Sequence, residues 1–420
     1  MTNKLIIDNF LIMKHAEINI TRYTIFVGPQ TSGKSVVAKL LYIFYHLPDF
    51  VYETATSGNK QRKLNESIKK TFCEIFPQYA WNEDEFCITF KTDFGEISFS
   101  HKPNKVLNLS FSNQYKKIIQ KVFTNSFKGL DINSFLSDRI DRRMFEDQIN
   151  RLEKIGKLIH ELDWGFINGA GNSLFIPAGR SFFSSLENNV FSFISKNIHI
   201  DYFLKEFGMI YQNSKNRLNT FSKDEITSKF SELCKKFIRG TYLSKQQKDY
   251  IKHIKSGREI EVKDASSGQQ ELLPLLFVVF FNNVNYLLIE EIETHIFPSS
   301  QHEIVKYIIS TRKNSSNQKS LLFTTHSPYV LTTINNLAYA GYLENKFANQ
   351  KDKLEKLDKI YSPKERIPYG ELSAYMFKDG NADSIIDDET LLICAEELDS
   401  ASDVTGNAFS EMLKLEMMEQ

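Results

Sequence analysis

The amino-terminal stretch YTIFVGPQTSGKS has the residue types and spacing of a phosphate-binding loop. Gly28, Gly33, Lys34 and Ser35 fill the pattern G-x-x-x-x-G-K-S. In such a loop the glycines let backbone N–H groups turn towards a phosphate. The lysine places a positive charge beside the β- and γ-phosphates, and the serine hydroxyl reaches Mg²⁺. An apolar run precedes the loop and apolar residues at helical spacing follow it, so the sequence predicts a strand, a loop and a helix.

Two adjacent carboxylates end a second apolar run, YLLIEEIETHIFP at residues 286–298. The run has the composition of a buried parallel strand, and Glu290 lies at its end. A carboxylate there suits a direct or water-mediated hold on Mg²⁺. Glu291 suits a general base that polarises the water attacking a γ-phosphate. Glu293 and His295 continue the motif into the following loop.

A third apolar run, SLLFTTHSPYVL at residues 320–331, ends in Thr324, Thr325 and His326. A histidine at the end of a strand can donate a hydrogen bond to a γ-phosphate oxygen. A lone histidine in a loop usually has no such role, so the neighbouring motifs decide the interpretation.

The segment ASSGQQELLPLLFVVFFN, residues 265–282, places a Ser-Ser-Gly-Gln turn directly before an apolar helix. A helix N-terminus presents free N–H groups and a positive dipole end to an anion. Ser266 or Ser267 could equally be an ordinary helix cap. Pro274 falls about two turns into the helix, where it can kink it.

An arginine follows another short strand pattern, LFIPAGRSFFSSL at residues 174–186. Pro177 and Gly179 break the strand and leave Arg180 at its end. Arg180 could reach an anion, or it could be a structural arginine that pairs with a carboxylate. The residues favour neither interpretation over the other.

The rest of the chain supplies the elements that must position these motifs. Residues 4–27 alternate between apolar and polar and predict two or three strands, and residues 86–90 and 96–100 predict a hairpin. Residues 113–162 predict charged helices, although their heptads are too short for a long coiled coil. Residues 187–260 predict mostly polar helices.

The composition is that of a globular protein. The chain has 420 residues, of which 41% are hydrophobic and 25% charged, enough for two or three lobes or for one core with a large insertion. No apolar run reaches about 18 residues and no export leader is visible, so we expect a cytoplasmic protein with no membrane partner. The four cysteines lack C-x-x-C spacing, which argues against a zinc site and against a disulfide framework.

Charge is unevenly distributed along a chain whose net charge is zero. Residues 379–420 contain twelve acidic residues and one lysine, a net charge of −11, so residues 1–378 carry +11. A basic body could bind a polyanion, and an acidic tail could bind a basic partner or the protein's own body. Charge runs of this kind are also common on faces that are simply solvated.

The order GPQTSGKS, SSGQQ, LLIEE and TTHS resembles the ABC-type ATPases of the RecF, SMC and OLD group. The resemblance implies an α/β fold: an ABC-type P-loop ATPase head with a mixed sheet flanked by helices, and a large, mainly helical insertion lobe. It divides the chain into residues 1–56 (first half of the head), 57–263 (insertion, with head strands near 174–180), 264–340 (second half of the head) and 341–420 (acidic extension).

The resemblance also implies which residues act. Lys34, Glu291 and His326 would be catalytic, and Ser35 and Glu290 would hold Mg²⁺. The residues implied to bind ATP are Gly28, Pro29, Gln30, Thr31, Ser32, Gly33, Lys34, Ser35, Val36, Ser266, Ser267, Gly268 and Gln269. The signature reads ASSGQQ where LSGGQ is commonest, and Glu290 stands where transporters carry Asp. With ETHIFP and IPAGRS, these departures look most like compact ATPases of bacterial antiphage defence modules such as OLD, Septu or PARIS.

In that family two ATP molecules lie between two heads. Each ATP is held by the Walker A and Walker B motifs of one copy, matched here by Lys34 and Ser35 and by Glu290 and Glu291, and by the signature helix of the other copy, matched here by Ser266 to Gln269. The resemblance therefore implies ATP and Mg²⁺ as ligands, a second copy of the chain as a partner, and hydrolysis that separates the copies. OLD proteins carry a Toprim nuclease after the ATPase, but the 94 residues after His326 contain no D-x-D pair. We therefore expect a separate nuclease or toxin as effector.

The alternative is a RecF-like DNA-repair or chromosome-maintenance ATPase. Lys and Arg side chains in residues 139–157 and 235–263 would then contact the phosphates of duplex DNA. A transporter ATPase is disfavoured because the lobe between the motifs is too long.

Overall fold

A large mixed sheet runs through the computed structural model, which describes residues 3–57, 60–126, 172–186, 200–220, 225–246, 248–313 and 319–394. Its strand order is β6-β5-β4-β1-β2-β14-β13-β3-β12-β11-β7. The strands are β1 (Asn3–Phe10), β2 (Met13–Ile20), β3 (Tyr23–Val27), β4 (Phe86–Thr92), β5 (Gly95–His101), β6 (Asn108–Phe111), β7 (Ser173–Ile176), β11 (Tyr286–Glu290), β12 (Ser320–Thr325), β13 (Leu372–Lys378) and β14 (Asn381–Ser384).

The sheet has an antiparallel part and a parallel part. Strands β6, β5, β4, β1 and β2 pair antiparallel, whereas β13, β3, β12, β11 and β7 are parallel neighbours. Every residue of β3, β11 and β12 is buried, as expected for parallel strands that are covered on both faces. The predicted α/β class, with a mixed sheet flanked by helices, is confirmed.

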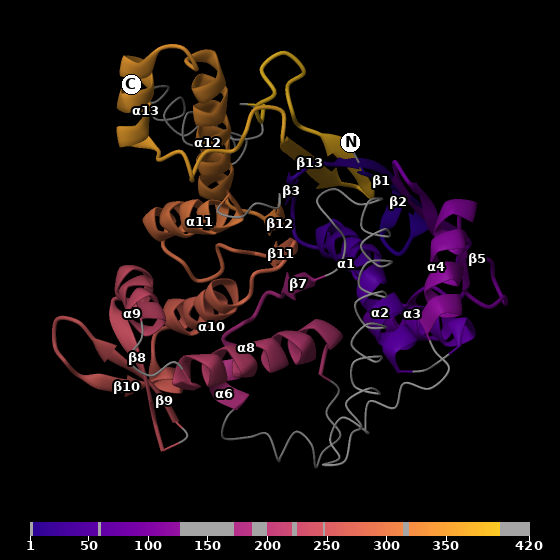
Figure 1. Ribbon diagram of the computed structural model, residues 1–420, viewed down its shortest axis with the longest axis horizontal. Helices are drawn as coiled ribbons and strands as arrows, with labels where there is room; N and C mark the ends of the chain where they lie inside the picture. Colours follow the sequence, from indigo (N-terminus) through magenta and orange to yellow (C-terminus); the bar gives the residue numbers. More distant parts are fainter. Residues whose placement is uncertain are drawn as a thin grey trace, which may run out of the picture.

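Two hydrophobic cores lie on the two faces of the parallel strands. On β11, Leu288 belongs to the first core, and Leu287 and Ile289 belong to the second. This division follows from the period-2 alternation of side chains along a strand. The first core is covered by α1 (Lys34–Tyr45), α2 (Leu47–Thr56), α3 (Gln61–Ile75) and α4 (Asn113–Ser126), which Figure 1 shows together on one side of β3, β12 and β11.

The second core is covered mainly by long helices from the later half of the chain. They are α8 (Tyr202–Thr220), α9 (Glu225–Ile238), α10 (Ser267–Phe281), α11 (Pro298–Lys313) and α12 (Pro328–Lys346). α10 is apolar on nearly all sides and continues through Pro274. The remaining helical segments are α6 (Phe182–Leu186), α13 (Lys351–Ile360) and the 3₁₀ turns η1 (Gln78–Ala80) and η3 (Val262–Asp264).

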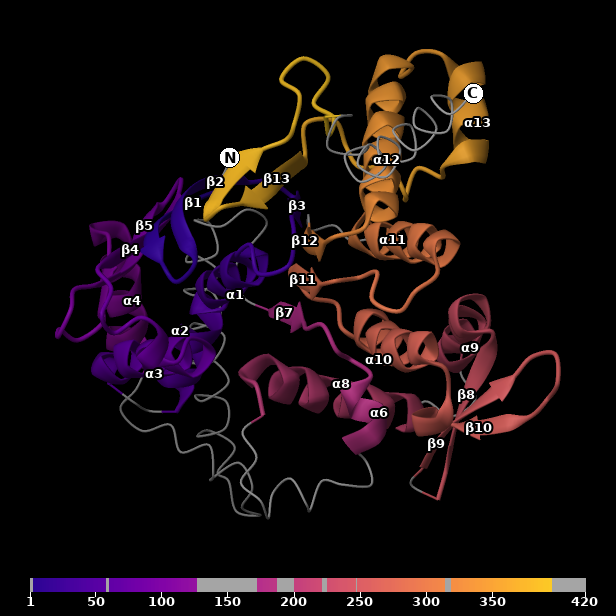
Figure 2. The ribbon, with the colours of Figure 1, turned by 180° about the vertical axis from the view of Figure 1, so that it is seen from behind.

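A small antiparallel sheet lies beside α9 and α10, opposite the end where α12 and α13 lie (Figures 1 and 2). It consists of β8 (Gly240–Lys245), β9 (Lys248–His253) and β10 (Glu259–Glu261). A buried contact joins it to α8, because Nζ of Lys215 donates to Oδ2 of Asp249 at 2.7 Å. None of the described helices is long and apolar enough to cross a membrane.

The structure matches the predicted strands within residues 4–27 and the predicted hairpin of β4 and β5, but it differs from two other expectations. The sequence predicts mostly helices for residues 187–260, yet Gly240–Lys245 and Lys248–His253 form a strand pair. The alternation of apolar and polar residues is hard to see in these strands because they are rich in charged residues. Lysines such as Lys245 form cross-strand ion pairs on the exposed face.

The second difference concerns residues 341–420, expected as an extension of the head. β13 lies beside β3 at the centre of the large sheet, so the head itself continues past residue 340. The acidic composition of the last residues masked the strand LSAYMFK, whose first four residues are buried. The basic stretch 139–157 lies outside the described residues.

Candidate functional site

The predicted site residues converge because parallel strands end at one edge of a sheet. Val27 at the end of β3 pairs with Thr325 of β12, and Glu290 of β11 pairs with Thr324. Strand β7 runs parallel on the far side of β11 and ends at Ile176. The phosphate loop, the two carboxylates, His326 and Arg180 therefore follow four neighbouring strand ends.

The phosphate loop adopts a conformation that requires glycine at two positions. Gly28 has φ +142° and Gly33 has φ +106°. A Cβ atom on Gly28 would lie 2.4 Å from the carbonyl oxygen of Phe377, and one on Gly33 would lie 2.2 Å from Sδ of Met13. The loop is therefore a close-fitting backbone cradle rather than an open turn.

Lys34 is buried and its Nζ lies within this loop. It donates hydrogen bonds to the carbonyl oxygens of Gly28 and Pro29, both at 2.7 Å. Burial lowers the pKa of Lys34, and the negative charges of nearby carboxylates, Glu291 first, oppose that shift. The ammonium group is thus held by carbonyl oxygens that a phosphate oxygen could replace.

Glu290 has the properties of a cation ligand. Its side chain is buried, which raises the pKa of its carboxyl, and the charge of Lys39 and hydrogen bonds from the Ser35 hydroxyl and the Ala178 N–H oppose that rise. Within the described residues, Oε1 of Glu290 has no hydrogen-bond partner. A buried acceptor with no donor calls for a positive partner.

Ser35 and Glu290 fit a magnesium site of the kind predicted. Mg²⁺ prefers oxygen ligands and is usually held by one or two protein groups, waters and phosphate oxygens. The structure brings the Ser35 hydroxyl and the Glu290 carboxylate together, and the unpartnered Oε1 remains for a cation. The described chain contains no group of three or more His, Cys, Asp or Glu residues arranged to hold a metal by themselves.

Glu291 has a strained backbone that several groups hold in place. Its φ is +44°, in the left-handed region that a residue with a Cβ rarely adopts. The Glu291 N–H donates to the carbonyl oxygen of Thr324 at 3.0 Å, and the Glu291 carbonyl accepts from Nη2 of Arg180 at 3.2 Å. Strain of this kind persists only where the surroundings over-determine it, and it is common at functional sites.

The side chain of Glu291 meets the predicted histidine. Oε1 of Glu291 lies 3.3 Å from Nε2 of His326, and both side chains are partly exposed. The backbone N–H of His326 donates to Oε1 of Glu293 at 2.5 Å, while Oε2 of Glu293 has no hydrogen-bond partner in the described structure. Glu290, Glu291 and Glu293 are therefore all close enough to Lys34 for their charges to act on its pKa, and His326 contacts two of them.

Arg180 is a structural arginine, the second of the two interpretations that the sequence left open. Its side chain is fully buried, and Nε lies 3.1 Å from Oε2 of Glu271. Nη1 donates to the carbonyl oxygens of Pro177 at 3.2 Å and Glu290 at 3.0 Å. No part of the guanidinium is left exposed for an external anion.

The signature residues begin α10 and form its cap. Ser266 is the N-cap residue, and its side chain and that of Gln269 form a reciprocal capping box. Nε2 of Gln269 donates to the carbonyl oxygen of Ile238 at 2.8 Å. A Cβ atom on Gly268 would lie 2.8 Å from the carbonyl oxygen of His295, so this position also requires close backbone approach.

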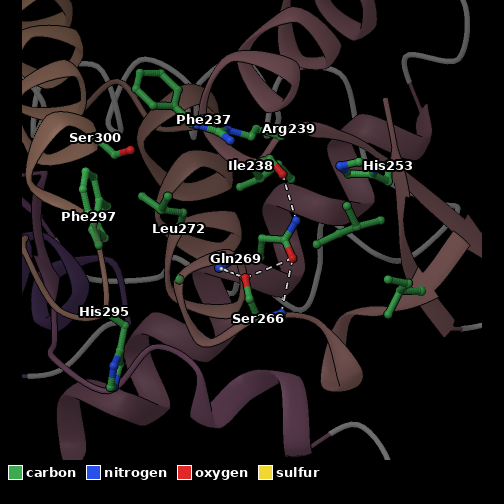
Figure 3. Close-up of a pocket in the computed structure, with 14 residues that line it drawn as sticks. Phe237, Ile238, Arg239, His253, Ser266, Gln269, Leu272, His295, Phe297 and Ser300 are labelled. Atoms are coloured by element: carbon green, nitrogen blue, oxygen red, sulfur yellow. Dashed lines mark hydrogen bonds between the residues drawn. The ribbon is translucent and has the colours of Figure 1, made fainter. Parts of the chain in front are cut away.

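A cavity of about 380 Å³ adjoins this cap (Figure 3). Ser266, Gly268 and Gln269 line it together with Arg239, His253, His295 and apolar side chains that include Phe297, which is 74% exposed. Among the described residues no hydrogen bond or ion pair joins residues 266–269 to the phosphate loop of the same chain. The structure thus brings together the predicted phosphate-loop and carboxylate residues and His326, whereas the signature residues among the described ones make no hydrogen bond to the phosphate loop.

Three residues of the site had no role assigned from the sequence. Lys39 lies one turn after Ser35 and interacts with the Glu290 charge, and Glu293 holds the backbone of His326. Glu271 binds Arg180. The sequence holds a signal for this pair, because Glu271 begins the apolar run ELLPLL and a fully buried Glu is almost always paired with a positive group.

Comparisons with known proteins identify the family. A family model described as AAA ATPase domain matches residues 1–331. No curated protein sequence matches the chain.

Three solved structures illustrate the structural comparison. The SMC head domain from Thermotoga maritima shares 10% identity and covers 91% of this chain and 98% of its own, with a TM-score of 0.38. The Smc head with an extended coiled coil, bound to the C-terminal domain of ScpA and derived from Pyrococcus furiosus, shares 14% identity over 91% and 95%, with a TM-score of 0.39. The recombination mediator protein RecF shares 11% identity over 92% and 98%, with a TM-score of 0.32. Because the family model spans residues 1–331 of the 420, the chain belongs to the AAA ATPase domain family.

Proposed function

We propose that the chain is an ABC-type ATPase that binds ATP with Mg²⁺, hydrolyses the γ-phosphate, and pairs with a second copy of itself when ATP is bound. The main observation behind the proposal is the arrangement around Glu291. Its backbone is strained, and its Oε1 lies 3.3 Å from Nε2 of His326. The same edge of the sheet holds Lys34 and Oε1 of Glu290, which has no hydrogen-bond partner among the described residues. Membership in an ATPase family supports the same conclusion.

The chain's own groups have distinct tasks in this proposal. Nζ of Lys34 leaves the carbonyl oxygens of Gly28 and Pro29 and donates to the β- and γ-phosphates. The carboxylate of Glu291 accepts a hydrogen bond from the attacking water and orients it, and Nε2 of His326 turns from Glu291 to the γ-phosphate. Ser35 and Glu290 would hold Mg²⁺, which neutralises phosphate charge when bound.

Pairing of two copies is supported by the isolation of the signature cap. Residues 266–269 border an open cavity rather than the phosphate loop of their own chain. In a twofold dimer each cap would face the loop of the other copy, which gives both sites the same composition. The exposed Phe297 beside the cap supplies apolar surface for such a contact.

The Glu291→Gln variant tests this proposal. It keeps the side-chain shape but removes the base, so we expect ATP hydrolysis to fall by about 100-fold to 10,000-fold while ATP binding persists. Size-exclusion chromatography with light scattering should find a dimer that needs ATP and Mg²⁺ and persists in this variant. Absence of any ATP-dependent association would refute the dimer.

A matched control is Glu303→Gln on α11, which removes a carboxylate that pairs with Lys236 and Lys306 rather than with a residue of the proposed site. This control should hydrolyse ATP at the wild-type rate. Equal loss of activity in both variants would contradict the role assigned to Glu291.

We further propose that the ATP-gated dimer controls a separate nuclease or toxin effector in antiphage defence. The motifs ASSGQQ, ETHIFP and IPAGRS support this assignment through their resemblance to compact defence ATPases. The test is to purify the chain with the product of the neighbouring gene and to measure whether ATP changes the composition or activity of the pair. No interaction in any nucleotide state would count against it.

A RecF-like role in binding duplex DNA remains the second candidate, because of four cations on or beside the small sheet. Arg239, Lys252, Lys255 and Arg258 have no ion-pair partner among the described side chains, whereas Lys245 is paired. Phosphate contacts would make affinity fall steeply with salt. Replacing Lys252 and Lys255 by Glu reverses their charge and should then weaken duplex binding at least about tenfold. Unchanged binding would exclude this surface as the DNA-binding site.

A further inference from the structure

The segment from Pro177 to Ser184 contacts both halves of the proposed bipartite site. It leaves strand β7 beside the Walker carboxylates and enters α6 beside the signature helix α10. In the described structure, residues 266–269 make no direct hydrogen bond to the phosphate loop. The segment from Pro177 to Ser184 therefore provides a physical connection between the two halves of the site. Its central residue is the fully buried Arg180.

On the signature side, the segment is bound to the first turns of α10. Both oxygens of Glu271 are used: Oε2 accepts from the Arg180 N–H at 3.1 Å and Oε1 accepts from the Ser181 N–H at 3.0 Å. The Glu271 side chain is fully buried, as is that of Arg180. Ser184 adds a hydrogen bond from its hydroxyl to Oε1 of Gln270 at 2.9 Å.

On the Walker side, the same arginine holds the backbone that carries the two carboxylates. Nη1 donates to the Glu290 carbonyl at 3.0 Å and Nη2 donates to the Glu291 carbonyl at 3.2 Å. The Ala178 N–H is close enough to the Glu290 carboxylate to lower its pKa. One guanidinium therefore joins Glu271 to two successive carbonyl groups.

We propose that Arg180 is a positioning residue that couples the signature helix to the direction of the Glu291 carboxylate. This inference rests on the proposed function. When residues 266–269 engage the nucleotide of the other copy, α10 shifts and Glu271 moves with it. Arg180 follows, because separating two fully buried opposite charges is strongly unfavourable. Since Glu291 has a left-handed backbone, a small movement of its carbonyl redirects its side chain.

Arginine suits this task and lysine does not. A guanidinium has five N–H donors in a rigid fork, so it can bind a carboxylate and two carbonyls at once. A lysine ammonium is a point charge on a flexible stem and would satisfy one side without fixing the other. Arg180→Lys therefore keeps the buried positive charge and removes the rigid connection.

The experiment compares Arg180→Lys with Arg312→Lys, a matched control. Arg312 is also buried, and its Nη2 donates to the carbonyl oxygens of Val284, Asn285 and Ser320, at the opposite ends of β11 and β12. Thermal unfolding, ATP affinity, ATP-dependent dimerisation and kcat are measured for both. We expect Arg180→Lys to keep ATP affinity within about threefold and to dimerise, while kcat falls about 100-fold.

Arg312→Lys should lower the unfolding temperature comparably and leave kcat of the folded protein within about threefold. A merely structural role of Arg180 would make the two variants alike, and that result would overturn the inference. Loss of ATP affinity in proportion to kcat in Arg180→Lys would also overturn it, because the arginine would then support nucleotide binding.

Glu271→Gln provides a second test if Arg180→Lys does not fold. It preserves the volume and one acceptor oxygen, removes the charge, and should lower kcat about tenfold at unchanged ATP affinity. Wild-type kcat in this variant would overturn the coupling. Absence of ATP hydrolysis in the wild-type protein would instead refute the proposed function, so the two failures are distinguishable.

Discussion

The two ends of strand β11 are each organised around a buried arginine, yet their surroundings have opposite chemistry. At the amino end Arg312 donates to the carbonyl oxygens of Val284 and Asn285, and at the carboxyl end Arg180 donates to those of Glu290 and Glu291. In both places one guanidinium holds the backbone of neighbouring strands. A buried guanidinium that donates to backbone carbonyl oxygens therefore occurs in two different chemical environments.

The amino end contains a surplus of donors. Arg22 lies beside Arg312 and donates to its carbonyl oxygen at 3.0 Å, and burial lowers the pKa of Arg312 to about 10. Here the atoms without hydrogen-bond partners in the described structure are Nε of Arg312 and the hydroxyl of Tyr23. Backbone carbonyls and Glu371 accept most of these donors, so this end is largely complete within the chain.

The carboxyl end contains a surplus of acceptors. Oε1 of Glu290 and Oε2 of Glu293 are buried without hydrogen-bond partners among the described residues, and Glu291 has a left-handed backbone. The one buried donor here that lacks a hydrogen-bond partner in the described structure, Nε of Arg180, lies 3.1 Å from the Glu271 carboxylate. Negative acceptors without donors require a cation that the chain does not supply. A buried arginine alone therefore does not mark a site, whereas an uncompensated group of carboxylates beside it does.

Replacing Arg312 by Met should have the largest effect and should be confined to stability. The change removes three hydrogen bonds to buried carbonyl oxygens, although the Asn285 carbonyl still accepts from the Ser320 N–H at 2.8 Å. We therefore expect a loss of about 3 kcal/mol in the free energy of unfolding. Urea unfolding at 25 °C measures it. ATP affinity of the folded fraction should stay at the wild-type value, and a change in that affinity would contradict the separation of the two ends.

Replacing Lys34 by Ala should have the largest effect on binding. Removal of a charge-assisted bond to phosphate is expected to weaken ATP binding about 100-fold, measured by titration calorimetry. Lys319 is the matched control, because it is also buried, has its pKa lowered mainly by burial, and lies at the amino end of β12. Lys319→Ala should bind ATP normally. ATP hydrolysis retained by Lys34→Ala would remove Lys34 from the site.

Replacing Glu290 by Gln should stabilise the nucleotide-free protein while removing its response to Mg²⁺. Because burial raises the pKa of Glu290, the ionised carboxylate is disfavoured in the folded state at neutral pH. The expected gain is on the order of 1 kcal/mol at pH 7 to 8. It should shrink as the pH falls through the raised pKa and vanish below the ordinary carboxyl pKa of 4.5.

Glu371 at the amino end provides the control for that variant. Its carboxylate pairs with Arg22 at 3.1 Å, so Glu371→Gln should lose about 0.5 kcal/mol rather than gain stability. Thermal unfolding across pH 4 to 8 compares the two variants. The same sign of change in both would contradict the contrast between the two ends.

Replacing Thr324 by Val should have the smallest effect and tests the support of Glu291. Oγ1 of Thr324 accepts from the Glu291 N–H at 3.2 Å, in addition to the bond that its carbonyl accepts. The variant should lose about 1 kcal/mol of stability and about threefold in kcat. Thr24→Val is the control, because Thr24 is a buried threonine near the start of β3 that bonds Ser373. It should lose similar stability and no activity.

The sequence predicted much of the candidate site because its signals are local. The glycines of the phosphate loop must accommodate positive φ, and apolar runs that end in carboxylates or histidine indicate buried strands whose ends carry polar groups. Those runs placed Glu290, Glu291 and His326 at strand ends, as the structure has them. Strand β13 was missed because the acidic composition that follows it dominated the interpretation of the whole segment.

Other features depended on residues far apart in the chain. The structural role of Arg180 depends on Glu271, which lies 91 positions away in the chain. Glu271 becomes its partner only when α10 packs beside the end of β7. The sequence could not choose between an anion-binding and a structural arginine, because both choices suit a strand end. Burial of the complete guanidinium decides it.

By itself, the sequence determined the chemistry that is available: a phosphate loop, a carboxylate pair and a histidine, each at the end of an apolar run. These follow from short-range patterns of residue type, which neighbours along the chain are sufficient to specify. Only the tertiary structure decided that four strand ends meet at one edge, that Glu291 adopts a left-handed backbone, and that Oε1 of Glu290 is left without a donor. The physical reason is that burial and hydrogen-bond satisfaction are properties of the packed molecule and not of any segment in it.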